Sequence, residues 1–220
     1  MDGHIEGMAR PSTRERILTE GLRVVHERGF AGASVRDIVQ AAGVPQGSFT
    51  NHFVSKEVFG LEVIGLYLAH SREVIGRTLR DDSLPPLLRL TAYVDSFQER
   101  SARSGVRHGC LFGNFTAEAS CHSELIRTRL VEIFAEIQQS IAYCLQAAVV
   151  AGDVPADTDC DEVAAFIVAS VQGAHLLAKA QRSPAPLERL KHMLPALLRS
   201  GMATPGQHEA GGTVHAQVER

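Results

Sequence analysis

The residues best equipped for chemistry lie in the segment GVRHGCLFGNF, residues 105–115. Cys110 follows Arg107 and His108, has glycines on both sides and stands just before a predicted helix. Nearby cations and a helix N-terminus both favour the thiolate, which is the nucleophilic form of cysteine. The glycines leave room for a reagent and let the backbone move afterwards. The segment predicts a reactive thiol, and the competing interpretation is a small buried side chain among the apolar residues that follow.

Zinc binding is a second chemistry that this region offers. Four side chains of types that bind zinc lie near one another in the sequence: His108, Cys110, Cys121 and His122. Their spacing lacks the tight cysteine pairs of structural zinc sites, so we expect neither a metal nor another cofactor. The other two cysteines, Cys144 and Cys160, are expected to be a core side chain and a surface thiol. Without CxxC pairs or a secretory leader, a disulfide framework is not expected.

Motifs typical of enzymes are missing from the chain. It contains no GxSxG nucleophile elbow, no glycine-rich phosphate loop and no HExxH zinc motif. The scattered carboxylates fit solvated helix faces. We therefore expect a protein that is not an enzyme.

The composition is that of a globular protein built from helices. Of the 220 residues 45% are hydrophobic and 21% charged, while Trp is absent and aromatics make up 5%. A core filled by aliphatic side chains favours helices over a β-sandwich. No apolar stretch reaches the ~18–20 residues of a membrane span, so a cytoplasmic protein without a membrane partner is expected. The net charge of −3 does not by itself suggest a nucleic-acid binder, although local patches matter more than the total.

Apolar periodicity and capping residues predict an all-α chain of about nine helices. The expected helices span residues 12–28, 34–43, 45–53, 55–79, 85–103, 111–119, 123–150, 160–181 and 186–200. We expect a DNA-binding domain at 12–55, a helical sensing and dimerisation domain at 56–201, and a disordered tail at 202–220.

The first 53 residues have the form of a helix-turn-helix. The second and third helices are joined by AAGV, in which Gly43 permits a tight reversal. Val44, Phe49 and Phe53 are expected to fill a small core. The third helix then exposes hydrogen-bonding groups suited to bases and phosphates. A small helical hairpin with polar exposed residues is the alternative.

Residues 14–60 closely resemble the DNA-binding domain of the TetR family of bacterial transcriptional repressors. The shared landmarks are Ile17, Gly29-Phe30, Ser34, Val35, Ile38, Ala42-Gly43-Val44, Gly47, Phe49, His52-Phe53 and Ser55-Lys56-Glu57. The resemblance implies a dimeric regulator with a divergent helical ligand-binding domain. It also implies that the third helix enters the major groove of a palindromic operator.

The resemblance also implies which residues contact DNA. Gln46, Gly47 and Ser48 match the start of the recognition helix; Thr50, Asn51 and His52 match its groove-facing side; Ser34 and Lys56 match positions that clamp the DNA backbone. Two positions depart from the family, which usually has Tyr where this chain has Thr50 and often Lys or Ser where it has Gln46. These departures predict a different operator sequence or weaker phosphate anchoring.

A fainter resemblance covers part of the second domain. The segments GCLFGNFTAEAS and GAHLLAKAQRSPAPL are similar to TetR-type repressors that respond to quinones, unsaturated carbonyls or oxidants. In that branch a cysteine at the position of Cys110 is associated with sensing, and Lys179 lies in the matching late segment. Cys121 and Lys179 are candidates to capture an oxidised Cys110. His175 is expected either to be a core histidine or to line an effector pocket.

The last two helices, 160–181 and 186–200, are expected to form a four-helix bundle with those of a second copy. We expect their apolar residues to be more numerous than one chain can bury: Val163, Phe166, Ile167, Val171, Leu187, Leu190, Leu194, Leu197 and Leu198. Two alternatives to electrophile sensing stay open. One is the same fold sensing a small apolar ligand without a covalent bond, and the other is a metal- or partner-binding helical protein with no role on DNA.

Overall fold

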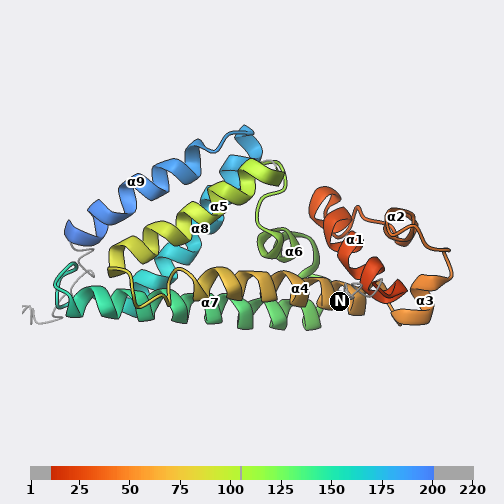
Figure 1. Cartoon of the computed structure of the whole chain (residues 1–220), viewed down its shortest axis with the longest axis horizontal. Helices are drawn as coiled ribbons and strands as arrows, with labels where there is room; N and C mark the ends of the chain where they lie inside the picture. The colour runs from red at the N-terminus through yellow and green to blue at the C-terminus, as the bar shows by residue number, and fades with distance from the viewer. Residues whose placement is uncertain (1–10, 105, 201–220) are drawn as a thin grey trace, which may run out of the picture.

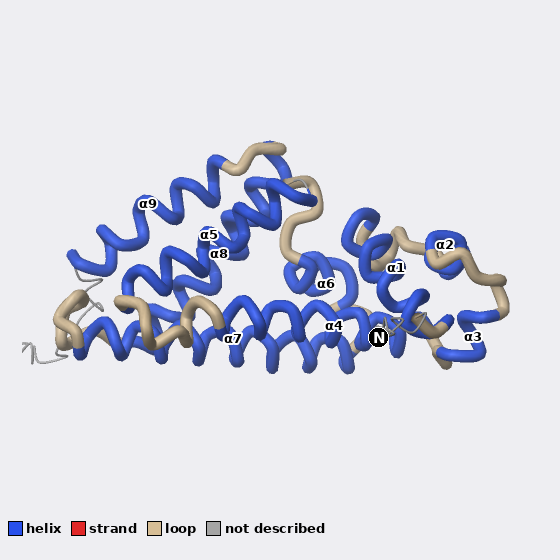
Figure 2. The backbone as a smooth tube through the Cα atoms, viewed as in Figure 1, coloured by secondary structure: helices blue, strands red, loops and turns tan. Residues whose placement is uncertain are grey.

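The computed structural model describes residues 11–104 and 106–200, and its regular elements there are all helices (Figures 1 and 2). They are α1 (Thr13–Arg28), α2 (Val35–Ala41), α3 (Ser48–His52), α4 (Lys56–Gly76), α5 (Pro86–Ser104), α6 (Leu111–Ala119), α7 (Glu124–Val150), α8 (Cys160–Gln181) and α9 (Ala185–Ser200). The all-α prediction is confirmed. The tail expected at 202–220 lies outside the described residues.

Most helix starts are fixed by local capping. Ser12 and Ser34 form capping boxes with the acidic residues three positions later, and Asp159 accepts two backbone N–H bonds at the start of α8. Such caps satisfy backbone groups that have no partner within the helix, so the sequence positions them well.

Two predicted boundaries are wrong. The third helix begins at Ser48, not Pro45, because residues 45–47 form a turn in which the Ser48 N–H donates to the Pro45 carbonyl at 2.9 Å. The long linking helix ends at Gly76 rather than 79, since the Arg80 N–H turns back to the Ile75 carbonyl at 3.1 Å.

The helices divide into a small head and a larger body. Helices α1–α3 form the head (residues 13–52) at one end, and α4 leads from it alongside α7 (Figure 1). Helices α5 and α8 pack on the far part of α7, and α9 packs on α5 and α8. Helix α6 lies between the head and these three helices. Any change in the body can therefore reach the head through α4 or α6.

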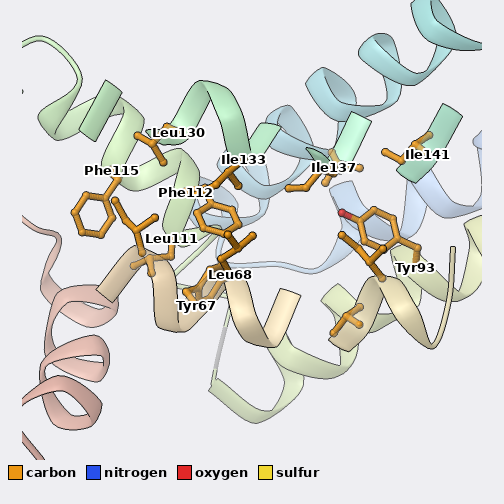
Figure 3. Close-up of a cluster of buried hydrophobic side chains, with 14 of the residues drawn as sticks. Tyr67, Leu68, Tyr93, Leu111, Phe112, Phe115, Leu130, Ile133, Ile137 and Ile141 are labelled. Atoms are coloured by element: carbon orange, nitrogen blue, oxygen red, sulfur yellow. The ribbon is translucent and has the colours of Figure 1, made fainter. Parts of the chain in front are cut away.

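Two aromatic clusters hold these parts together. Phe49, Phe53 and Phe59 lie with ring centroids 5.1–5.3 Å apart and join α3 to α4. The apolar side of α6 points toward α4 and α7, as Figure 3 shows for Leu111, Phe112 and Phe115 beside Leu68 and Leu130. Offset and edge-to-face ring contacts add to area burial, so α6 is anchored firmly on this side.

Helices α7 and α8 are long and apolar enough to span a membrane, contrary to the expectation of no such stretch. They pack against each other and supply much of the core of the body, so they are core helices of a globular protein. The reason for the high apolar content of α8 is that it carries apolar residues on both sides. Val163, Ile167 and Val171 are buried, while Phe166 and Leu177 are about half exposed, at 49% and 50%.

Candidate functional site

The turn between α2 and α3 has the geometry expected of a helix-turn-helix. Gly43 has a φ of +62°, a left-handed conformation that favours glycine. The Arg16 guanidinium of α1 donates to the carbonyls of Ala42 and Gly43, the latter at 3.1 Å. The turn is thus stabilised both by its own backbone conformation and by hydrogen bonds from α1.

Helix α3 buries one side and exposes the other. Phe49 is 3% exposed, and Val44 packs partly buried against the same core, as predicted. The exposed residues on and before α3 are Gln46, Gly47, Thr50, Asn51 and His52, whereas Ser48 is half-buried. The Thr50 hydroxyl donates to the Gly47 carbonyl at 3.1 Å. A short polar edge therefore projects from the end of the molecule, with the amides of Gln46 and Asn51 upon it.

The two expected backbone-clamping residues already have partners. The Ser34 hydroxyl accepts the Asp37 N–H and lies 2.5 Å from the Asp37 carboxylate, so it serves first as the cap of α2. The Lys56 ammonium lies 4.8 Å from the centre of the Phe30 ring and 3.4 Å from the Ala31 carbonyl. Burial lowers the pKa of Lys56, and the Glu118 carboxylate partly opposes this effect.

Most other cations of the head are paired inside the protein. The pairs are Arg14 with Glu62, Arg23 with Glu20 and Glu27, and Arg28 with Asp37. Arg36 is exposed on α2, and within the described part of the chain neither an ion pair nor a hydrogen bond holds it. The DNA contacts predicted from the sequence did not include Arg36. Its position on the helix before the turn is the signal that could have singled it out.

A groove of about 490 Å³ lies between α6 and α8. Cys110 and Lys179 both line it, although they are far apart in the sequence. So do Gly113, Ala117 and Leu176, which give it a largely apolar wall. Cys110 is the N-cap of α6 and is half-buried, so its thiol lies at the positive end of that helix dipole. The structure thus brings together two residues that the sequence proposed for sensing.

A chain of hydrogen bonds ties Lys179 to the loop before α6. The Lys179 ammonium donates to Asn114 Oδ1 at 3.0 Å, and Asn114 Nδ2 donates to the His108 carbonyl at 2.8 Å. A Cβ added at Gly109 would lie 3.4 Å from Lys179 Cδ, so the lysine stem passes close to the backbone beside Cys110. Asn114, which sequence reasoning missed, fixes the lysine head group on this side of the groove.

The remaining sensing candidates divide into one in the groove and one outside it. His175 is 8% exposed and packs edge-on against Phe97, with ring centroids 4.9 Å apart, so it is a largely buried histidine that also lines the groove. Cys121 is exposed and does not line the groove. It lies beyond the opposite end of α6, whose nine residues span about 14 Å. The expectation that Cys121 could capture an oxidised Cys110 in the same chain is therefore corrected by the length of this helix.

The other two cysteines, Cys144 and Cys160, have raised pKa values and do not line the groove. Burial raises the pKa of Cys144 to about 11, in keeping with its expected place in the core. Burial also raises the pKa of Cys160, with the nearby Asp161 and Asp159 adding to the effect. All four cysteines lie in the described ranges and are thiols rather than disulfides. Within those ranges, no three His, Cys, Asp or Glu side chains are grouped so as to hold a metal.

The groove is linked directly to the head. His26 of α1 donates from Nε2 to the Gly109 carbonyl at 3.0 Å, one residue before Cys110. The His26 ring also lies 5.4 Å from His108 and 5.7 Å from Tyr67 of α4. A displacement of the backbone at residues 108–110 must therefore alter a contact of α1.

Comparisons with known proteins agree with this architecture. Residues 17–63 match the family described as bacterial regulatory proteins, tetR family, and residues 86–194 match the tetracyclin repressor-like C-terminal domain. The chain is 39% identical over 194 residues to the HTH-type transcriptional repressor DhaR of Mycobacterium sp. strain GP1, covering 88% of this chain and 96% of DhaR.

Solved structures show the same fold. A regulatory protein TetR from Rhodobacter sphaeroides superposes with a TM-score of 0.80 at 31% identity, covering 84% of this chain and 97% of that one. The reduced form of Escherichia coli NemR gives a TM-score of 0.77 at 26% identity, covering 86% and 98%.

Proposed function

The chain belongs to the TetR family of bacterial transcriptional regulators, and we propose that it is a homodimeric repressor released from a palindromic operator by a reaction at Cys110. Family membership makes it a DNA-binding regulator rather than an enzyme. The relatives are bacterial regulators, and operator binding implies a place of action in the cytoplasm. The working division of the chain is a DNA-binding domain at 12–55 and a sensing and dimerisation domain at 56–201.

Operator binding is supported by the exposed polar edge of α3. Asn51 and Gln46 carry amides that can make paired hydrogen bonds to adenine in the major groove. His52 and the Gly47 backbone extend the same edge, and we expect the exposed Arg36 on α2 to contact a phosphate. Ser34, Ser48, Thr50 and Lys56 remain proposed DNA contacts. Since the Thr50 hydroxyl and Lys56 have partners within the protein, we expect them to contribute less than Asn51.

The single observation that carries the sensing proposal is that Cys110 and Lys179 line one groove. The α6 dipole and the lysine ammonium both favour negative charge at the thiol. In the reaction with an unsaturated carbonyl compound, the thiolate forms a C–S bond to the β-carbon. The alkene electron pair then takes a proton from water at the α-carbon. A solved structure whose description gives its redox state, the reduced form of NemR, is consistent with thiol chemistry in this fold.

A noncovalent apolar effector is a second candidate, because the groove wall is largely apolar, with Gly113, Ala117 and Leu176 among the residues that line it. His175 and Gln172 would then orient the ligand. In either case the response passes through residues 108–110 to His26 and α1. A full reversal from 1:99 to 99:1 requires about 5.5 kcal/mol of differential stabilisation, which a covalent bond supplies more readily than a weak ligand.

The test begins with a palindromic duplex selected from random DNA by the unaltered chain. N-Ethylmaleimide or a quinone is added to the complex, and release is measured for the unaltered chain, Cys110→Ser and the matched control Cys121→Ser. We expect release for the unaltered chain and Cys121→Ser but not for Cys110→Ser. Release that persists in Cys110→Ser rejects the thiol mechanism and favours the noncovalent effector.

A further inference from the structure

Glu118 lies where the effector groove meets the head. It stands near the end of α6 and lines the same groove as Cys110. Its carboxylate reaches out of the body, because Oε2 accepts the Ala31 N–H at 2.9 Å. Ala31 belongs to the turn between α1 and α2. A side chain of the sensing domain therefore holds the backbone of the DNA-binding domain directly.

The turn is shaped to receive this carboxylate. Gly29 has φ +80° and ψ 160°, a conformation available essentially to glycine alone. A Cβ added there would lie only 2.5 Å from Glu118 Oε1. The carboxylate thus occupies the space that any other residue at position 29 would fill. One α-helical turn earlier, Phe115 stacks on Phe30 with ring centroids 4.8 Å apart, so α6 contacts the turn twice.

A cation contacts the other backbone polar group of the same residue. The Lys56 ammonium donates to the Ala31 carbonyl at 3.4 Å, so Ala31 lies between an acid from α6 and a base from α4. Three residues later Ser34 caps α2, the first helix of the helix-turn-helix. A hydrogen bond to a charged group is stronger than a neutral one, which makes the Glu118 contact a substantial restraint on where α2 begins.

We propose that Glu118 is a positioning residue for operator binding: it fixes the α1–α2 turn in the DNA-binding arrangement and releases it when a change in the groove displaces α6. The proposal rests on the proposed function, in that operator release is the response it transmits. The head is then held to α6 at both ends of this helix, through the His26–Gly109 contact at its start and the Glu118–Ala31 contact near its end. Glu118 contacts no DNA itself and acts only through Ala31 and α2.

The experiment uses the full chain with Glu118→Ala, Glu118→Gln and the control Glu132→Ala. Glu132 is exposed on α7 and pairs with Arg129 at 2.8 Å, so its removal changes the same charge away from the head. Affinity is measured for the selected palindromic duplex, and amide hydrogen exchange is followed at Ala31. We expect Glu118→Ala to weaken binding by about tenfold and to speed exchange at Ala31. Glu118→Gln keeps an acceptor oxygen, so its dissociation constant for the duplex is expected to stay within about threefold of that of the unaltered chain.

The response to thiol modification distinguishes a role of Glu118 in transmitting the signal from a purely structural role. The ratio of dissociation constants after and before N-ethylmaleimide measures the coupling between groove and operator. We expect this ratio to fall in Glu118→Ala, because the contact is already broken, and to stay unchanged in Glu132→Ala. A Glu118→Ala protein that keeps its operator affinity and its slow Ala31 exchange overturns the proposal.

Failure of the proposed function gives a different pattern. If the unaltered chain is not released by N-ethylmaleimide, thiol sensing fails, and affinity without reagent still decides the role of Glu118. If no duplex is selected, operator binding fails, and the exchange rate at Ala31 decides whether Glu118 holds the turn. Equal exchange in the unaltered and Glu118→Ala chains then rejects it.

Discussion

The Asn51 side chain lies on the exposed edge of α3, opposite the buried Phe49. Asn51→Ala removes an amide able to pair with one adenine, so operator binding should weaken by about 1–3 kcal/mol and preference at one base per half-site should relax. The matched variant is Arg36→Ala. It should weaken binding to all DNA sequences alike, and it should reduce the slope of the logarithm of the binding constant against the logarithm of the salt concentration by about one. Gel shifts over a range of salt concentrations distinguish the two. Unchanged base preference in Asn51→Ala would mean that another residue reads that position.

Three of the thiols, Cys110, Cys121 and Cys144, should differ in reactivity because their surroundings differ. Burial raises the pKa of Cys144 to about 11, so only a small fraction of this thiol is thiolate near neutral pH. At pH values below this pKa, the thiolate fraction increases about tenfold for each unit by which the pH rises. We expect maleimide at pH 7.5 to label Cys110 first, then the exposed Cys121, and to leave Cys144 unlabelled until the protein is denatured. Peptide mass spectrometry over time gives the order. Native labelling of Cys144 as fast as Cys121 would contradict the assignment of Cys144 to the core.

At the scale of elements, α1 and α4 cross at Gly21. A Cβ there would lie 2.3 Å from the ring of Phe59, which is itself fully buried. Gly21→Ala should therefore lower the free energy of unfolding by about 1–3 kcal/mol, despite the better helix propensity of alanine. Gly65→Ala is the control, since no atom lies within 4 Å of a Cβ at that position on α4.

The control should raise stability by about 0.5–1 kcal/mol through helix propensity alone. Urea unfolding of both variants measures the difference. If Gly21→Ala is as stable as Gly65→Ala, then α1 and α4 are not packed as closely as described, and the head can shift on α4 at little cost.

At the scale of the whole molecule, the proposed dimer face consists of other residues of α8 and α9 than some of those expected from the sequence. Ile167 and Leu194, which the sequence suggested as dimer contacts, are 0% and 2% exposed within one chain. A charge at either position would unfold the core of the body instead of separating two chains. The apolar side chains left exposed on α8 and α9 are Phe166, Leu176, Leu177, Met193 and Leu197. These are the residues that a second copy would cover.

Phe166→Glu combined with Leu177→Glu should give a folded monomer with little operator affinity. The reason is that one head alone cannot span two half-sites about 34–36 Å apart. Val131→Glu on α7, at a side chain 57% exposed, should leave the dimer intact. Sedimentation checks the mass against the 23.8 kDa chain. A stable monomer for the unaltered protein would refute the dimer.

Local features of the sequence determined the elements and the family. Serine and aspartate caps, the glycine of the AAGV turn and apolar periodicity predicted the helix bounds to within a few residues, because these signals act over three or four positions. The exceptions are the third helix and the end of the linking helix. There a turn stabilised by backbone hydrogen bonds competes with continued helix. Gly47 and Gly76 stand at these two boundaries, but a glycine is also tolerated inside a helix, so it does not fix the boundary by itself.

Tertiary structure alone decided which distant residues meet. Packing of α6 between the head and α8 brings Lys179 to the groove beside Cys110, carries Cys121 away from it, and places the Glu118 carboxylate on the Ala31 amide. It also decided which apolar residues of α8 and α9 one chain buries. Helical periodicity shows that a side is apolar but not what covers it, since that depends on how the helices pack against one another.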